Sequence, residues 1–162
     1  MDFPEPTTPC DDERQVLLSY LDYFRSVLLE KCQGIDVHAT ALPSGWTPAE
    51  LLNHLRHVER RWLEWGFEGR PMNDAWADWQ DGRWHTADDL PTLHAALQAQ
   101  AATTRHIVES HALDERGQPG ERWDGAEPAT LQRVLLHLVQ EYARHAGHLD
   151  VVRELRDGLE GE

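Results

Sequence analysis

The chain has 162 residues, a length that fits one domain of ordinary size with a substantial buried core. Its 29 acidic and 15 basic side chains give a net charge of −14, which disfavours binding to nucleic-acid phosphates and to anionic lipid surfaces. The apolar runs are far shorter than the roughly 20 residues that span a bilayer, and the N-terminus lacks a signal-peptide pattern. We therefore expect a cytoplasmic protein without nucleic-acid or membrane partners.

The first part of the chain predicts two helices. Apolar side chains recur at helical spacing over about residues 11–32. A second helix is predicted over about 47–65. Thr47 and Glu50 form a capping-box pattern there, and Pro48 suits the first helical turn.

The middle of the chain, residues 66–87, is its least regular segment. It contains glycine and proline breakers, and its three tryptophans, set among aspartates, are Trp76, Trp79 and Trp84. A long irregular segment inside a compact domain is commonly a lid or a binding element. We therefore predict that these tryptophans line a substrate pocket.

The second part of the chain also predicts two helices, over about 88–111 and about 129–156, with a loop rich in glycine and proline between them. No segment shows the strict alternation expected of strands. Four helices with a long connection in the middle predict an all-α fold, a four-helix bundle with a long crossover. We expect one domain over 11–158, with loosely ordered ends at 1–10 and 159–162.

Two polar side chains lie on the apolar stripe of the last predicted helix. Glu141 and His145 are four residues apart, a spacing that lets one helix offer two ligands to one metal ion. His54 lies on the apolar stripe of the helix over 47–65, so a bundle core can bring the three donors together. The alternative is that Glu141 pairs with an arginine while the histidines are unrelated core residues. We favour a metal site, because an isolated charged Glu in an apolar core costs several kcal/mol unless it is paired or bound to a metal.

Three further histidines compete for the same role. His148 and His137 flank the pair on the last helix at helical spacing, and His57 follows His54 by one turn. By helical angle, His57 falls on the flank of its helix, so we expect it at the surface or orienting a ligand. His148 and His137 stay open as alternative ligands.

Two segments resemble a known family: Leu52–Trp62, which reads LNHLRHVERRW, and His137–Asp150, which reads HLVQEYARHAGHLD. They are similar to the DinB/YfiT-like superfamily, and more closely to its actinobacterial branch of mycothiol-dependent, metal-dependent thiol S-transferases. The resemblance covers about residues 11–158. It implies a four-helix bundle that holds a divalent metal, zinc first and nickel second, and a homodimer.

In that superfamily the metal is held by one His on the second helix and a pair at i and i+4 on the last helix. The resemblance therefore implies His54, Glu141 and His145 as ligands. Three protein ligands leave positions open on a divalent metal, and a coordinated thiol is deprotonated. The implied reaction is attack by the metal-bound thiolate of a low-molecular-weight thiol, such as mycothiol, on an electrophilic small molecule.

Arginines near these motifs are candidates to hold anionic substrate groups, and the sequence does not select among Arg56, Arg60, Arg144 and Arg153. We group Arg144 with the three tryptophans in the expected pocket.

Two other functions stay open at this point. One is a metal-dependent hydrolase, in which the same metal activates water. The other is a metal-binding or interaction module without catalysis, which predicts a closed coordination shell that includes His148.

Overall fold

Four α-helices form the body of the protein. The structure is a computed structural model that describes residues 3–40 and 42–159. The helices are α1 (Glu13–Lys31), α2 (Pro48–Arg60), α3 (Leu90–Ser110) and α4 (Leu131–Asp157). They pack together as predicted, so the expected four-helix bundle is confirmed.

Shorter elements lie between the helices. They are the π-helix η1 (Arg61–Phe67), the strands β1 (Trp79–Gln80) and β2 (Arg83–Trp84), and the 3-10 helix η2 (Glu121–Trp123).

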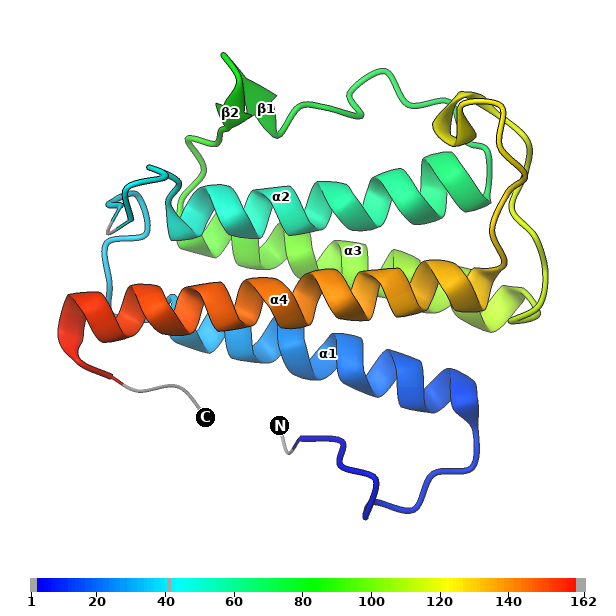
Figure 1. Cartoon of the computed structure of the whole chain (residues 1–162), viewed down its shortest axis with the longest axis horizontal. Helices are drawn as coiled ribbons and strands as arrows, with labels where there is room; N and C mark the ends of the chain where they lie inside the picture. Colours follow the sequence, from blue (N-terminus) through cyan, green and yellow to red (C-terminus); the bar gives the residue numbers. More distant parts are fainter. Residues whose placement is uncertain (1–2, 41, 160–162) are drawn as a thin grey trace.

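The four helices form two pairs, α1 with α4 and α2 with α3. Within each pair the chain runs in the same direction, and the two pairs run in opposite directions (Figure 1). Two neighbouring helices with the same direction need a connection that returns along their length. The segment from η1 to α3 makes that return beside α2, which is the predicted crossover (Figure 1).

Each helix begins at a side chain that accepts a hydrogen bond from the first helical turn. The four capping residues are Asp12, Thr47, Asp89 and Thr130. Thr47 also forms the predicted capping box with Glu50. These caps satisfy backbone N–H groups that have no partner within the helix.

A buried polar cluster connects all four helices. The Glu59 carboxylate on α2 is fully buried and accepts hydrogen bonds of 3.0 and 2.8 Å from Arg25 on α1. Thr104 on α3 donates to the same carboxylate at 2.5 Å, and Tyr142 on α4 also donates to it. Burial and the Glu59 charge raise the pKa of Tyr142 well above its usual value, so its hydroxyl stays a donor. Because a buried charge requires paired and hydrogen-bonded surroundings, this cluster fixes how the helices face one another.

The second helix departs from its prediction. The sequence predicts an α-helix to about residue 65, but the α-helix gives way to η1 at Arg61. A π-helical turn widens the helix and shifts the side chains that follow it. In this wider turn Arg61 is buried and donates to the backbone carbonyl of Ala75 at 2.9 Å. π-Helical turns are rare and have no simple sequence pattern, so the spacing of apolar residues did not predict this one.

The expectation that no strands form is wrong for a short segment of the crossover. Strands β1 and β2 pair antiparallel, with Trp79 opposite Trp84. The turn between them has Asp81 at φ 52° and Gly82 at φ 81°. An Asp-Gly pair with both φ values positive is a favoured two-residue hairpin turn, so the signal was present in the sequence. The hairpin places the Trp84 ring against His54 of α2.

The chain ends are described in part. Residues 1–2 and 160–162, within the ends expected to be loosely ordered, lie outside the described residues. Phe3 packs edge-on against Tyr20 and Tyr23 of α1. Among the described residues, no helix is both long and apolar enough to cross a membrane.

We predict that Tyr142→Phe lowers the free energy of unfolding by about 1.5–3 kcal/mol, because it removes a hydrogen bond to a buried, charged acceptor. Urea denaturation followed by circular dichroism measures the change. Tyr23→Phe is the matched control, because the half-buried Tyr23 packs through its ring against Phe3 and Phe24, and its hydroxyl makes no hydrogen bond to any described residue. Equal, small effects of the two substitutions would contradict the role given to the Glu59 cluster.

Candidate metal centre

Three donors from two facing helices meet at one place in the bundle. His54 comes from α2, and Glu141 and His145 come from α4. One ligand atom from each lies within 4.8 Å of the other two. The Nε2 atom of His145 is 3.4 Å from Oε2 of Glu141. A tetrahedron with metal–ligand bonds of about 2.0–2.1 Å has edges of about 3.4 Å, so this pair is spaced as two ligands of one zinc-sized ion.

The three donors differ in burial. His145 is buried, whereas the side chains of His54 and Glu141 are 16% and 18% exposed. The sequence predicts that all three side chains lie on the apolar, core-facing stripes of their helices. This prediction is wrong for His54 and Glu141, which lie at the edge of the core. A site at the edge leaves one side open to a small molecule.

The orientation of His54 is fixed by a buried ion pair. Its Nδ1 lies 3.0 Å from Oδ2 of Asp78, and Asp78 accepts hydrogen bonds of 2.6 and 3.1 Å from Arg61. Burial alone would raise the pKa of Asp78, but the hydrogen bonds from His54 and Arg61 lower it to about 2. Asp78 is therefore a carboxylate at neutral pH, and Nδ1 of His54 must be the donor. The lone pair of Nε2 is left available for a metal, an arrangement common among metal-binding histidines.

Burial and two neighbouring histidines keep the His145 imidazole neutral. Its Nδ1 lies 3.4 Å from Nδ1 of His148. Burial, with the neighbouring His54 and His148, lowers the pKa of His145 to about 3. The imidazole is therefore neutral at physiological pH, as metal binding requires.

The competing histidines take other positions. His148 contacts His145, and Nε2 of His137 lies 3.7 Å from Oε1 of Glu141. Among the described residues, the three-donor group includes neither of them, nor His57. The surface position that helical angle allows for His57 is wrong. His57 is buried, its Nε2 lies 2.8 Å from the Arg56 guanidinium, and burial with that charge lowers its pKa to about 4.

Of the three tryptophans expected to line a pocket, Trp84 lies against the triad. Its ring stacks on His54 at 4.1 Å between centroids and meets His145 edge-on at 5.5 Å. Trp76 and Trp79 are 58% and 50% exposed. Arg144 is also exposed. A pocket role for Trp76, Trp79 and Arg144 stays a prediction.

Sequence reasoning missed two residues that orient the site, Asp78 and Arg61. Asp78 is one of several aspartates in the crossover and has no spacing relation to His54, from which it is separated by 24 residues. Arg61 sits in the helical turn whose widening was not predicted. Only the folded arrangement of the crossover reveals their contact.

Comparison with known proteins identifies the family. The model of the mycothiol-S-transferase family matches residues 16–158, which is most of the chain. The chain belongs to the mycothiol-S-transferase family. No curated protein and no solved structure matches it significantly.

Family membership implies that this DinB/YfiT-like protein is an enzyme, a mycothiol S-transferase, as the resemblance predicted. Mycothiol is thereby implied as its thiol substrate.

We predict that Asp78→Asn weakens zinc binding by about 10–100-fold, the usual effect of removing a group that orients a metal-binding histidine. Competition with a chromophoric chelator measures the affinity, and circular dichroism checks the fold. Asp74→Asn is the matched control, since Asp74 lies in the same segment and pairs with Arg60 at 3.0 Å. If both variants bind zinc as tightly as the unmodified protein, Asp78 does not orient a ligand.

Proposed function

We propose that this mycothiol S-transferase works through a divalent metal held by His54, Glu141 and His145. The convergence of one ligand atom from each residue, all within 4.8 Å, carries the proposal. His54, Glu141 and His145 would hold the metal, which would supply mycothiol as its thiolate at neutral pH by lowering the pKa of a bound thiol. The sulfur then forms a bond to an electrophilic carbon of the second substrate, whose leaving group departs with the bonding electron pair. The thiol proton passes to solvent.

The surrounding side chains position the ligands and shield them. Asp78, paired with Arg61, holds the His54 ring, and His148 contacts the far nitrogen of His145. The Trp84 ring covers one face of His54 and limits the access of water from that side. Local exclusion of water strengthens the attraction between a thiolate and a cation.

Zinc is the first candidate for the metal and nickel the second. Two imidazoles and one carboxylate form a donor set that suits several divalent ions, so geometry and supply decide the occupant. The homodimer, the single domain over 11–158 and the cytoplasmic location are further parts of this proposal. Sedimentation analysis tests the dimer.

The two other functions, a metal-binding module without catalysis and a hydrolase, require different features of the same site. A module without catalysis requires a fourth protein ligand, and His148 is directed at His145, outside the three-donor group. A hydrolase requires the metal to activate water, with no need for a thiol.

We predict that the tag-free protein binds about one zinc ion per chain, and that His54→Ala and Glu141→Ala each remove it, since two remaining ligands hold zinc weakly. Plasma mass spectrometry of the purified proteins measures the stoichiometry. His106→Ala, at an exposed position on α3, is the control and should keep the metal. Folded, metal-free unmodified protein that stays empty after zinc is added would disprove the site.

We also predict that adding mycothiol to the cobalt-substituted protein produces a near-ultraviolet thiolate-to-metal charge-transfer band, because the thiol binds as an anion. Conversion of monobromobimane, an alkylating electrophile, should then require mycothiol. Consumption of an ester or amide substrate without any thiol, together with no band, would favour the hydrolase.

A further inference from the structure

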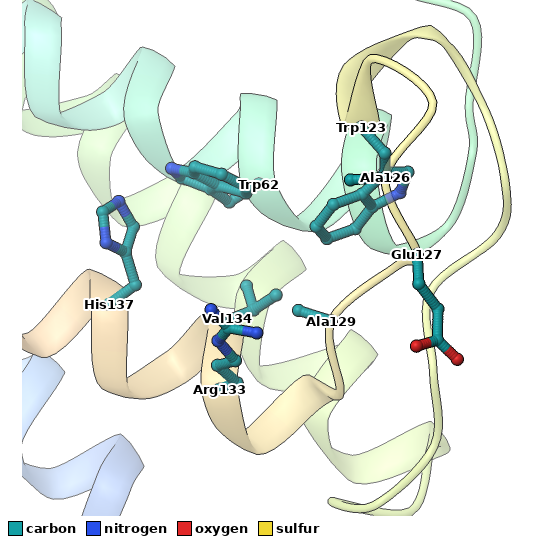
Figure 2. Close-up of a pocket in the computed structure, with 8 residues that line it drawn as sticks. All are labelled: Trp62, Trp123, Ala126, Glu127, Ala129, Arg133, Val134 and His137. Carbon is teal, nitrogen blue, oxygen red and sulfur yellow. The ribbon is translucent and has the colours of Figure 1, made fainter.

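A cavity of about 280 Å³ lies beside the metal centre, between η1 and the first turns of α4. Figure 2 shows Trp62 and Trp123 on one side of it and Val134 and Arg133 on the other, with His137 at one end. Small-molecule sites usually have volumes of about 300–1,000 Å³. This cavity is therefore large enough for one part of a ligand, whose remainder must extend elsewhere.

His137 joins the cavity to the metal centre. Its ring lines the cavity, and its Nε2 lies 3.7 Å from Oε1 of Glu141. His137 and Glu141 are one helical turn apart on α4, about 6 Å along the axis. A ligand with one end at the triad and its body in the cavity must therefore have a short spacer between the two.

Polar contacts hold the aromatic walls of the cavity in place. The Arg122 guanidinium lies 3.7 Å from the centroid of the Trp62 ring. The Trp123 indole N–H donates to the carbonyls of Gly66 and Gln118 at 3.0 Å. The two rings have centroids 5.8 Å apart and are tilted by 54°. Fixed indole faces, which carry negative charge density, attract the C–H faces of sugar rings.

The polar side chains that line the cavity include both positive and negative charges. The Arg133 side chain forms no ion pair with any described residue, and Glu127 at the rim lies 3.4 Å from Arg116. Arg133 can only donate hydrogen bonds, Glu127 can only accept them, and His137 can do either. A neutral polyhydroxylated ligand satisfies all three. An anionic body would face Glu127 and the net charge of −14.

We propose that this cavity binds the sugar portion of mycothiol, the glucosaminyl-inositol unit, while its sulfur reaches the triad. This inference rests on the proposed function. In mycothiol one N-acetylated cysteinyl residue separates the sulfur from the glucosamine. A residue spans about 3.5 Å along its backbone, and the cysteine side chain adds a comparable reach, which together match the helical turn between His137 and Glu141. The cavity thus selects mycothiol over thiols that lack the sugar unit.

The test is binding of N-acetylglucosaminyl-inositol, a neutral, cysteine-free analogue in which the glucosamine nitrogen is an amide as in mycothiol, measured by isothermal titration calorimetry on the full chain. We expect binding to the unmodified protein and, with similar affinity, to His54→Ala, because the cavity does not need the metal. Trp62→Leu should weaken binding by at least about tenfold, and Arg133→Gln by about threefold to tenfold. Arg156→Gln removes the same charge at the other end of α4 and should leave the affinity unchanged.

The outcomes separate this inference from the proposed function. No binding to the folded, unmodified protein, or equal affinity of Trp62→Leu and the unmodified protein, overturns the sugar site. Binding that depends on Trp62 and Arg133 supports it, even if the protein holds no metal and transfers no thiol, in which case the proposed function fails alone. Loss of binding in Arg156→Gln equal to that in Arg133→Gln would show that only overall charge is sensed, and would also overturn it.

Discussion

The Glu59 carboxylate, buried among groups from all four helices, determines how those helices face one another. Its partner on α4 is Tyr142, which lies next to Glu141 and three residues before His145. Because Tyr142 points inward to Glu59, helical geometry also fixes the directions in which Glu141 and His145 point, toward α2. His54 lies on α2 within two turns of Glu59. A cluster that stabilises the bundle therefore also sets the register of the proposed metal ligands.

The side chains that orient and cover the proposed ligands come from segments that depart from a regular bundle. The π-helix η1 buries Arg61, which holds Asp78, which in turn holds His54. The hairpin in the crossover supplies Trp84 as a cover. Regular helices thus provide the donors. The irregular segments orient and shield these donors and, together with the first turns of α4, line the neighbouring cavity.

The fold and the meeting of the three candidate donors were predictable, because both follow from local periodicity in a helical bundle. Apolar spacing predicts the four helices, and a carboxylate and an imidazole one turn apart predict the pair on α4. Asp78 was not predictable, since its contact with His54 depends on how the crossover folds back over α2. The burial of His57 was missed because helical angle describes one helix and not the segments that cover it. The hairpin was missed although its Asp81-Gly82 turn is a recognised signal, because the flanking strands are too short to show alternation.

The most direct test of the account is the zinc K-edge X-ray absorption spectrum of the zinc-loaded protein, recorded without and with mycothiol. We predict a shell of nitrogen and oxygen ligands at about 2.0–2.1 Å in both samples, and one sulfur at about 2.3 Å only after mycothiol is added. The seryl analogue of mycothiol, which keeps the sugar unit and has no thiol, should give no sulfur signal. A spectrum that mycothiol leaves unchanged, at a concentration that saturates turnover, would contradict thiolate binding at the metal.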